Sequence, residues 1–367
     1  MGELQYDFLI VGAGWYGSVC ARELTDKGYS CLVIDKRSHI GGNCYTEKIE
    51  DIDIHRYGAH IFHTNDEKIW DYVNNLGDFN NFVNSPLAKA NGKLYNLPFN
   101  MNTFYQVWGI SDPNQVKEKI SQDSKVYTNP KNLEEQAISL VGEDIYKLFI
   151  KGYTEKQWGM QCKDLPNSII KRLPVRLTFD NNYFNDRFQG IPNNGYTSLF
   201  ENLLQGIEVK LNTDYFDFIK NHELIFKKTI YTGPIDLYYD NIYGKLDYRS
   251  LRFEDEMLDT DNYQGNAVVN YTTHEEKFTR ILEHKHFSKN NKSNKTIITR
   301  EYPDKYDGKN EPYYPINNEK NMDIFKKYKE KSLLEKDVLF GGRLAEYRYY
   351  DMHQIIASAL KFVSTYE

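Results

Sequence analysis

Residues 6–17 read YDFLIVGAGWYG, and this stretch decides the fold of the N-terminal part of the chain. Its apolar first half is typical of a buried β-strand, and Gly12, Gly14 and Gly17 follow in the spacing Gly-x-Gly-x-x-Gly. The helix-like segment SVCARELTDKG comes next, and the apolar run CLVID then ends at Asp35. Strand, glycines, helix, strand and terminal acid in this order predict a βαβ unit that binds a dinucleotide.

Each residue of this motif has a physical role in the predicted site. Gly12 and Gly14 let the backbone approach a pyrophosphate closely, and Gly17 lets the helix pack against the sheet. The helix N-terminus then faces the anion, and Asp35, 23 residues after Gly12, stands where a ribose 2′-hydroxyl is held. The alternative interpretation is a structural βαβ crossover whose glycines are incidental.

The segment after the second strand indicates which dinucleotide is bound. It reads KRSHIGGNC over residues 36–44, where Lys36 is followed by a glycine pair that ends in Gly42 and Asn43. A basic residue and a Gly-Gly pair in this position resemble the FAD-binding, glutathione-reductase-like flavoproteins rather than the NAD dehydrogenases. The resemblance implies FAD as the cofactor, with Lys36, Gly42 and Asn43 among the residues that bind it.

The composition describes an acidic protein with many aromatic rings. A chain of 367 residues is long for one core, so two or three domains are expected. The net charge of −6 leaves no basic excess for nucleic acid binding. The 30 tyrosines and 20 phenylalanines suit a site that stacks on a ring and donates hydrogen bonds to anions, although a coding bias would give the same numbers.

Cysteine usage and hydropathy indicate the compartment. The four cysteines lack CxxC spacing, so neither a disulfide framework nor a zinc site is expected. The first strand-like run begins within six residues of the N-terminus, which leaves no room for a signal peptide, and no apolar segment reaches 18 residues. We therefore expect a cytoplasmic protein that does not insert into a membrane.

The fold class expected from the whole chain is α/β, with a helical insertion and an antiparallel sheet insertion in a Rossmann-like domain of the glutathione-reductase-like type. Helix-forming residues with apolar spacing near 3.6 fill about 100–163, strand-like alternation marks 250–316, and a surface helix is predicted over 319–336. The expected units are a discontinuous FAD-binding domain of residues 1–84, 196–248 and 317–367, a helical domain of residues 100–163, and an antiparallel sheet domain of residues 85–99, 164–195 and 249–316.

Two histidines stand three positions apart in RYGAHIFHT, residues 56–64. Three interpretations of His60 and His63 are open: metal ligands, a base with its partner, or core histidines. A metal site needs further ligands, and the other histidines fall in no motif that supplies them. The favoured hypothesis places this loop over the flavin, where neutral imidazoles contact the ring and assist proton movement.

The far end of the chain supplies a second anion-facing helix. Residues 340–353 read FGGRLAEYRYYDMH, and Asp351 stands at the N-cap position of the helical run QIIASALKFV. The free N–H groups and positive end of such a helix suit the electron-rich pyrimidine edge of a reduced, anionic flavin. The alternative is a plain turn followed by a cap.

Eight motifs taken together resemble one family. In chain order they are GAGWYGS, IGGN, YGAHIFHT, YTEKQWG, KRLPVR, YRSLRFE, PYYPI and GGRLAEYRYYDM, and they extend over almost the whole sequence. In this order they resemble the prokaryotic UDP-galactopyranose mutases. The resemblance implies an isomerase that interconverts UDP-galactopyranose and UDP-galactofuranose by ring contraction through a covalent adduct at N5 of reduced FAD, with no net redox change.

The resemblance also assigns site residues. It implies that Arg172 and Arg280 clamp the diphosphate, with His63 assisting catalysis. The substrate-binding residues that it implies are Asn84, Phe149, Tyr153, Trp158, Arg172, Tyr183, Asn270, Arg280, Tyr314 and Tyr349, where Tyr313 could replace Tyr314. Phe149 and Tyr153, four apart on an expected helix, would sandwich the uracil. The cofactor-binding residues are Gly12, Gly14, Gly17, Asp35, Lys36, Gly42, Asn43, His60, His63, Arg249, Arg343, Tyr349, Asp351 and Met352.

Several alternatives stay open from the sequence. Ala59 stands where several family members carry proline, so the sugar pocket could differ, and UDP-N-acetylgalactosamine is a possible second substrate. A flavin oxidoreductase of the amine-oxidase type shares the N-terminal motifs, and a non-catalytic nucleotide-binding protein is a third class. A homodimer that serves galactofuranose biosynthesis for cell surface polysaccharide is expected by resemblance.

Overall fold

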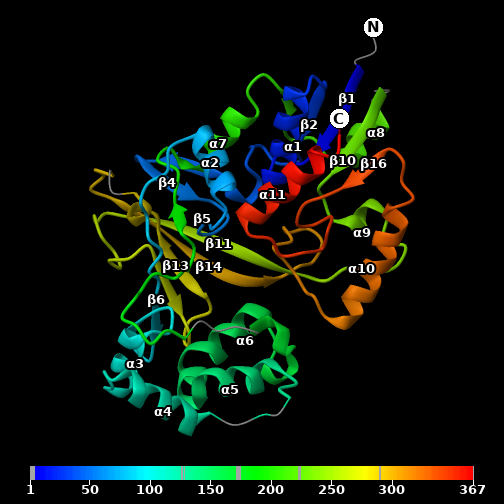
Figure 1. The fold of residues 1–367 in the computed structure, drawn as a ribbon. Coiled ribbons are helices and arrows are strands. Elements are labelled where there is room, and N and C mark those ends of the chain that lie inside the picture. The colour runs from blue at the N-terminus through cyan, green and yellow to red at the C-terminus, as the bar shows by residue number, and fades with distance from the viewer. Residues whose placement is uncertain are drawn as a thin grey trace.

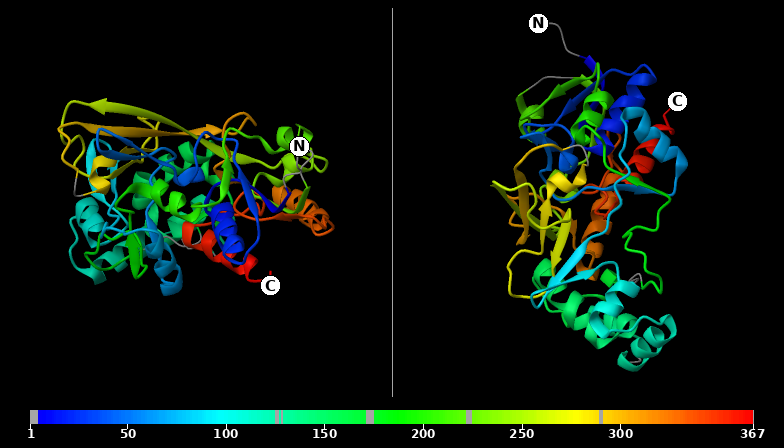
Figure 2. Two further views of the ribbon diagram at one scale, coloured as in Figure 1. Left: turned by 90° about the horizontal axis from the view of Figure 1, so that it is seen from above. Right: turned by 90° about the vertical axis from the view of Figure 1, so that its left-hand side faces the viewer.

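The computed structural model describes residues 5–124, 127, 129–170, 175–221, 225–288 and 291–366. Three layers follow one another along the molecule (Figures 1 and 2). A parallel sheet with its helices stands at one end, a twisted seven-stranded sheet lies in the middle, and a group of helices stands at the other end. Both termini lie at the end with the parallel sheet.

The parallel sheet confirms the predicted βαβ unit. Its five strands are ordered β16-β10-β1-β2-β9, and every neighbouring pair is parallel. The strands are β1 (Gln5–Val11), β2 (Cys31–Ile34), β9 (Glu208–Lys210), β10 (Ile225–Tyr231) and β16 (Val338–Phe340). The four residues of β2 are all buried, as expected for a strand covered on both faces. Segments from the two halves of the chain therefore build one sheet.

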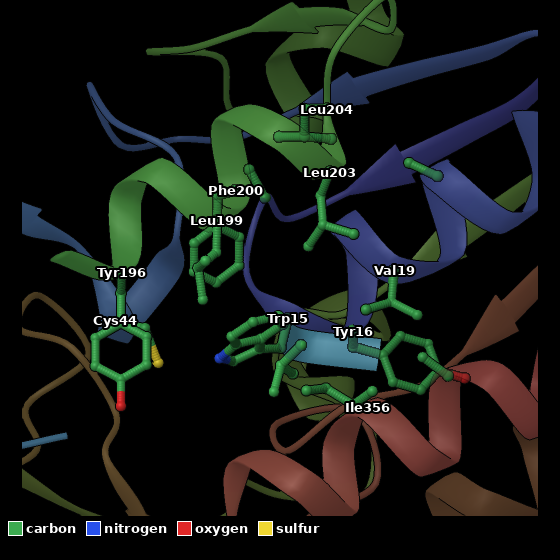
Figure 3. Packing of buried hydrophobic residues seen from close by; sticks show 14 of the residues in the cluster. Trp15, Tyr16, Val19, Cys44, Tyr196, Leu199, Phe200, Leu203, Leu204 and Ile356 are labelled. Atoms are coloured by element: carbon green, nitrogen blue, oxygen red, sulfur yellow. The ribbon is translucent and has the colours of Figure 1, made fainter. Parts of the chain in front are cut away.

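Helices from distant parts of the chain cover one face of this sheet. They are α1 (Trp15–Asp26), α2 (Glu67–Leu76), α7 (Gly195–Leu203) and α11 (Met352–Val363). Figure 3 shows their common core, in which Trp15 packs on Phe200 with ring centroids 4.6 Å apart and Val19 faces Ile356. The buried apolar surface holds α11, at the C-terminal end, beside α1, at the N-terminal end.

The seven-stranded sheet has the order β15-β11-β14-β13-β12-β6-β7. Its strands are β6 (Leu87–Ala90), β7 (Lys93–Asn96), β11 (Tyr248–Leu258), β12 (Val268–Tyr271), β13 (Arg280–Glu283), β14 (Thr296–Lys305) and β15 (Tyr314–Pro315). The pairs are antiparallel as expected, except that β12 and β6 run parallel. The hairpin of β6 and β7 thus extends the sheet beyond β12, a strand that follows much later in the chain.

The helical layer contains an irregularity that the sequence did not reveal. Its helices are α3 (Met101–Trp108), α4 (Pro113–Asp123), α5 (Leu133–Ile145) and α6 (Gly152–Trp158). A π-helix, Tyr146–Lys151, joins α5 to α6. Such wide turns are frequent at functional sites, because they change the direction in which neighbouring side chains point.

Further helices and strands lie between or beside these layers. They are β3 (Thr46–Ile49), β4 (Ile52–His55), β5 (Phe62–Thr64), β8 (Phe188–Gly190), α8 (Tyr215–Asn221), α9 (Ile235–Tyr238) and α10 (Glu319–Ser332). Helix α10 confirms the surface helix predicted over 319–336. Among the described helices, none combines the length and the apolar character needed to cross a lipid bilayer.

The glycine loop gives a test of how tightly α1 packs. A Cβ at Gly17 would overlap the carbonyl oxygen of Gly12, whereas a Cβ at Gly14 would come no closer than 3.7 Å, to Cα of Gly42. Overpacking at rigid backbone is costly, so we expect Gly17→Ala to lower the free energy of unfolding by about 1–3 kcal/mol. Urea denaturation measures this loss. Gly14→Ala is the matched control, and an equal loss in both variants would contradict the assignment.

Candidate functional site

A chain of cavities runs from the glycine loop toward the seven-stranded sheet. The first has a volume of about 320 Å³ and is lined by the glycine loop and Asp35. The second, of about 650 Å³, is called the inner cavity here, and it shares Asn43, His60, Arg343 and Met352 with the first. A third, the outer cavity of about 1180 Å³, shares Tyr153, Arg280, Tyr314 and Tyr349 with the inner one.

The glycine loop closes the narrow end of this series. Gly12 has a φ of +108°, which favours glycine, and a Cβ there would collide with the hydroxyl of Thr232. Gly14 is the N-cap of the twelve-residue helix α1, so free N–H groups and the positive helix end face the cavity. The loop thus has both the space and the donors that a pyrophosphate requires.

Asp35 orders the loop as well as facing the predicted ribose position. One carboxylate oxygen, Oδ2, accepts a hydrogen bond from the backbone N–H of Ala13 at 2.8 Å, and Oδ1 accepts one from the N–H of Arg37 at 2.9 Å. Each carboxylate oxygen can accept a second bond. Asp35 can therefore hold the loop and bind a ribose hydroxyl at the same time.

The sequence did not indicate Glu311, which lines the cavity of the glycine loop. Its carboxylate forms ion pairs with Lys36 at 2.9 Å and with Arg37 at 3.0 Å. Burial alone would raise the pKa of Glu311, but the two cations lower it below its usual value. Lys36, a predicted cofactor residue, is thus held by an acid that no local motif could have indicated.

Orphaned polar atoms in the inner cavity indicate a polar ligand. The side-chain atoms Asn84 Oδ1, Asn270 Oδ1 and Arg343 Nε are buried without a hydrogen-bond partner. Leaving such atoms unsatisfied is costly unless a ligand or water completes them. All three belong to residues predicted to bind the sugar or the cofactor.

His60 is held as a neutral imidazole. Its Nδ1 lies 2.7 Å from the carbonyl oxygen of Gly58, so Nδ1 carries the proton and Nε2 is free to accept. Burial, together with the nearby charge of Arg343, lowers the pKa of His60 to about 4. The neutral imidazole expected from the sequence is consistent with these contacts.

His63 has a carboxylate partner that the sequence did not reveal. Its Nδ1 lies 2.5 Å from Oδ2 of Asp186, and its ring stacks on Phe184 with centroids 3.8 Å apart. The carboxylate fixes the proton on Nδ1 and leaves Nε2 as an acceptor. His63 also lies with Asp351 and His353 in a group whose possible metal-ligating atoms are within 4.8 Å of one another. Asp351 is already the N-cap of α11, as predicted.

Arg280 lies at the junction of the inner and outer cavities. Its guanidinium donates a hydrogen bond to the hydroxyl of Tyr153 at 2.5 Å, and its Nε lies 3.3 Å from Oε1 of the buried Glu301. Burial raises the pKa of Glu301, while Arg280 opposes this change. The Nε of Arg280 faces Glu301, whereas Arg280 lines both cavities, so the terminal N–H groups of its guanidinium can reach an anionic ligand.

Tyrosines surround Arg280 at this junction. Tyr314 and Tyr349 line both cavities, with ring centroids 5.7 Å apart, and Arg343 lies over the Tyr349 ring at 4.9 Å. Burial raises the pKa of Tyr153, Tyr314 and Tyr349. Their hydroxyls therefore stay neutral and can donate to an anion. Tyr313 lines only the inner cavity, which leaves Tyr314 the better placed of the two.

The remaining predicted residues divide between the cavities. Phe149, on the π-helix, lines the inner cavity and also packs on Tyr95 of the helical core, with ring centroids 5.1 Å apart. Trp158 and Arg249 line the outer cavity, where Nε of Arg249 donates to the carbonyl of Gln157 at 2.9 Å. Arg172 lies outside the described residues.

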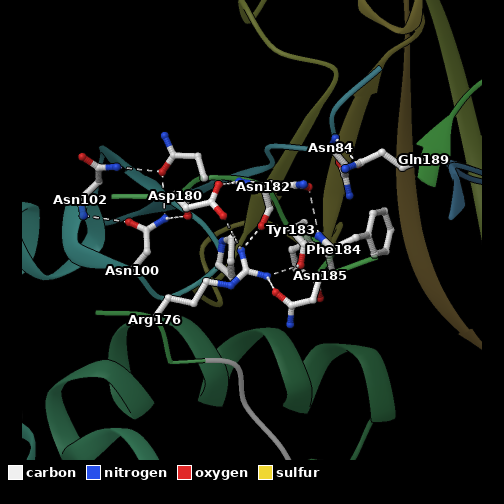
Figure 4. Close-up of polar contacts among 12 residues, drawn as sticks. Asn84, Asn100, Asn102, Arg176, Asp180, Asn182, Tyr183, Phe184, Asn185 and Gln189 are labelled. Atoms are coloured by element: carbon white, nitrogen blue, oxygen red, sulfur yellow. Dashed lines mark hydrogen bonds and ion pairs between the residues drawn. The ribbon is translucent and has the colours of Figure 1, made fainter. Parts of the chain in front are cut away.

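A second arginine of the KRLPVR motif, Arg176, organises the loop that carries Tyr183 (Figure 4). Its partly buried guanidinium donates to the carbonyl of Asn182, to the carbonyl of Tyr183 at 3.2 Å and to the side chain of Asn185. The N–H of Tyr183 donates to the carbonyl of Asn84 at 2.7 Å. Arg176 therefore holds two predicted substrate residues, and its motif was the signal that could have identified it.

The geometry and the fold define the class of protein first. A glycine loop, a helix N-terminus and a linked cavity fit an extended dinucleotide, and residues 10–76 match the NAD(P)-binding Rossmann-like domain. A crystal structure of reduced UDP-galactopyranose mutase shares the fold with a TM-score of 0.76 at 16% identity, over 99% of this chain and 94% of that one. A redesigned putrescine oxidase shares the fold with a TM-score of 0.53 at 13% sequence identity, over 99% of both chains. The protein therefore has the Rossmann-like fold of a dinucleotide-binding protein.

The sequence comparisons then identify the family. Residues 148–349 match the UDP-galactopyranose mutase family model. The dTDP-fucopyranose mutase of Escherichia coli is 40% identical over 98% of this chain and 97% of that protein. A probable UDP-galactopyranose mutase of Klebsiella pneumoniae is 41% identical over 97% of this chain and 93% of that protein. The chain belongs to the UDP-galactopyranose mutase family and is therefore an isomerase.

The oxidoreductase alternative has less support. The pseudooxynicotine dehydrogenase of Pseudomonas sp. is 31% identical over 75 residues, which is only 20% of this chain. An amine-oxidase-type reaction would need an apolar channel for a hydride donor. The cavities described here carry Arg280, its tyrosines and orphaned amide groups instead.

Buried histidines give the site a defined pH response. Burial lowers the pKa of His284 to about 3, that of His60 to about 4 and that of His55 well below its usual value. Below about pH 6.5 the unfolded chain binds these protons and the folded chain does not, so stability falls as the pH falls. We expect the melting temperature to drop between about pH 7 and about pH 5. His284→Gln should flatten this dependence, and an unchanged slope would contradict it.

Proposed function

We propose that this protein interconverts the pyranose and furanose forms of UDP-galactose, with reduced FAD as its cofactor. The observation that carries the proposal is the position of Arg280. A partly buried cation with three neutral tyrosine hydroxyls beside it stands at the mouth of the cavity that continues to the glycine loop. This arrangement suits a diphosphate whose sugar points toward the flavin.

The residues at the junction would stabilise the departing diphosphate. Bound FAD in its reduced form would supply the nucleophile and the electron pair for ring opening and reclosure, without net redox. As the bond between sugar and diphosphate breaks, negative charge grows on the phosphate oxygen. This charge can be stabilised without reorganisation by the guanidinium of Arg280 and by hydrogen bonds from the hydroxyls of Tyr153, Tyr314 and Tyr349.

The histidine loop would serve the sugar and the cofactor. His63 can take a proton at Nε2 during ring opening and return it on reclosure, because Asp186 holds its Nδ1. His60 is neutral and contributes no charge that would compete with Arg343. Asp351 begins the twelve-residue helix α11, whose positive end favours an anionic flavin ring.

A second substrate class has a specific basis. The Escherichia coli relative at 40% identity is named a dTDP-fucopyranose mutase, so dTDP-fucose is a second candidate beside UDP-galactose. Ala59 lines the inner cavity and leaves more room than proline would. UDP-N-acetylgalactosamine is therefore a third candidate substrate.

Cellular context and assembly are also proposals. Four buried, free cysteines are consistent with a reducing cytoplasm. We propose a cytoplasmic homodimer that supplies galactofuranose for cell surface polysaccharide, and light scattering of the purified protein tests the dimer. The division into FAD-binding, helical and sheet domains is kept as a proposal that limited proteolysis can test.

Product analysis with chemically reduced enzyme tests the proposed reaction. We expect UDP-galactofuranose to be converted to UDP-galactopyranose over many turnovers without flavin oxidation. UDP-N-acetylgalactosamine and the furanose form of dTDP-fucose are assayed in parallel. Product that forms only with stoichiometric flavin oxidation would support the oxidoreductase, and turnover of dTDP-fucose alone would reassign the substrate.

Arg280→Ala tests the diphosphate role. We expect kcat/KM to fall by at least about 100-fold with flavin content unchanged, because a preorganised charge is lost. The sequence resemblance predicts the same loss for Arg172→Ala. Arg300→Ala is the control, since Arg300 lies on the neighbouring strand and pairs with Glu256. Activity near that of the wild type in Arg280→Ala would remove this residue from the site.

Arg176→Met tests how the Tyr183 loop is held. We expect KM to rise about tenfold, because three hydrogen bonds to the loop are lost. In a Tyr183→Phe background the same substitution should have a smaller effect, since both changes act through one side chain. Arg187→Met, on the exposed part of the same segment, is the control. Strictly additive effects would contradict the positioning role.

A further inference from the structure

Lys156 makes a set of contacts that the reaction does not require. It lies on α6, and its ammonium donates to the backbone carbonyls of Tyr271, Glu276 and Phe278 at 2.9, 3.1 and 2.9 Å. An ammonium has three donors, and all three are used. Among the described residues no carboxylate lies close enough to form an ion pair with Lys156, so its direct hydrogen-bond partners are carbonyl groups.

The three carbonyls belong to the last residue of β12 and to the turn between β12 and β13, and this turn packs closely on the helical layer. A Cβ at Gly152 would overlap the carbonyl oxygen of Thr272. The hydroxyl of Thr272 donates to the carbonyl of Leu148 at 2.8 Å, and His274 lies 3.1 Å from Glu155. The π-helix, α6 and the β12–β13 turn thus form one continuous interface, and Figure 1 shows α6 beside the end of the sheet.

Each side of this interface carries part of the candidate site. On α6, Tyr153 stands three residues before Lys156 and therefore on the same face. On the sheet, Arg280 begins β13 two residues after Phe278. The guanidinium of Arg280 reaches the hydroxyl of Tyr153 at 2.5 Å. The separation of these two side chains is therefore set by how α6 sits on the turn.

We propose that Lys156 is a positioning residue of the nucleotide-sugar site. Its ammonium holds the β12–β13 turn against α6 and so fixes the spacing between Tyr153 and Arg280. The inference rests on the proposed function, because it concerns the same diphosphate site. Lys156 does not itself line the inner or the outer cavity, and it acts through Tyr153 and Arg280, which line both.

The charge of this lysine gives the device a pH dependence. Burial lowers the pKa of Lys156 to about 8, although Glu276 opposes the change. A neutral amine has only two donors and turns a lone pair toward the third carbonyl. The contact of Lys156 with the β12–β13 turn therefore weakens above about pH 8. Other charged or titratable groups around this interface include Lys89, Tyr153, Glu155, Tyr271, His274, Arg280 and Glu301.

Three variants of the flavin-loaded enzyme test the proposal. Lys156→Met keeps the length of the side chain but removes all donors, and we expect kcat/KM to fall about tenfold, mainly through KM. Lys151→Met, on the same helical stretch and exposed, is the matched control and should behave as the wild type. Lys156→Arg keeps a permanent charge, so the loss of kcat/KM above about pH 8 should move to higher pH.

A double-mutant cycle keeps the proposal falsifiable if Lys156→Met folds poorly. In a Tyr153→Phe background, Lys156→Arg should change kcat/KM less than in the wild-type background, because both substitutions act on one contact. Additive effects, an unmoved alkaline limb in Lys156→Arg, or wild-type KM in Lys156→Met would each overturn the inference. A wild-type enzyme without mutase turnover would overturn the proposed function itself, so the two failures are distinguishable.

Discussion

The packing of α11 against α1 is the constraint on which the rest of the structure depends. These helices come from opposite ends of the chain, and the buried surface between them holds the N-terminus of α11 beside the inner cavity, which adjoins the cavity of the glycine loop. Gly341 is required in the segment before α11, because a side chain there would collide with Tyr16. One apolar contact therefore places two positive helix ends around a single series of cavities, which a dinucleotide anion needs.

Charge is handled differently at the two ends of these cavities. Near the glycine loop, the cations of Lys36 and Arg37 are both paired with Glu311 and leave the anion to backbone N–H groups. At the other end, the Nε of Arg280 faces Glu301, and neutral tyrosines lie nearby. The arrangement around Arg280 suits an anion whose negative charge increases during a reaction, because hydrogen-bond donors are available when the charge develops.

The substrate side of the site depends on contacts between layers. Arg280 comes from the seven-stranded sheet, Tyr153 from the helical layer, and Tyr349 from the segment before α11. The π-helix before α6 and the contacts of Lys156 on α6 determine how Arg280 and Tyr153 meet. Arg176 performs a comparable task for the loop of Tyr183. The residues of the candidate site are thus positioned by contacts between separate segments, and Lys156 and Arg176 hold these segments together through hydrogen bonds.

Local patterns determined much of this protein by themselves. The glycine spacing predicted the βαβ unit, the Asp351 cap predicted the start of α11, and the motif series predicted the family, because each depends on neighbours in sequence. Only the tertiary structure decided the partners: Asp186 for His63, Glu311 for Lys36, and the turn carbonyls for Lys156. These partners lie 115 or more residues away, and no periodicity or spacing encodes a contact over that separation. Their choice follows from the packing of whole layers, which brings the groups together after the local elements have formed.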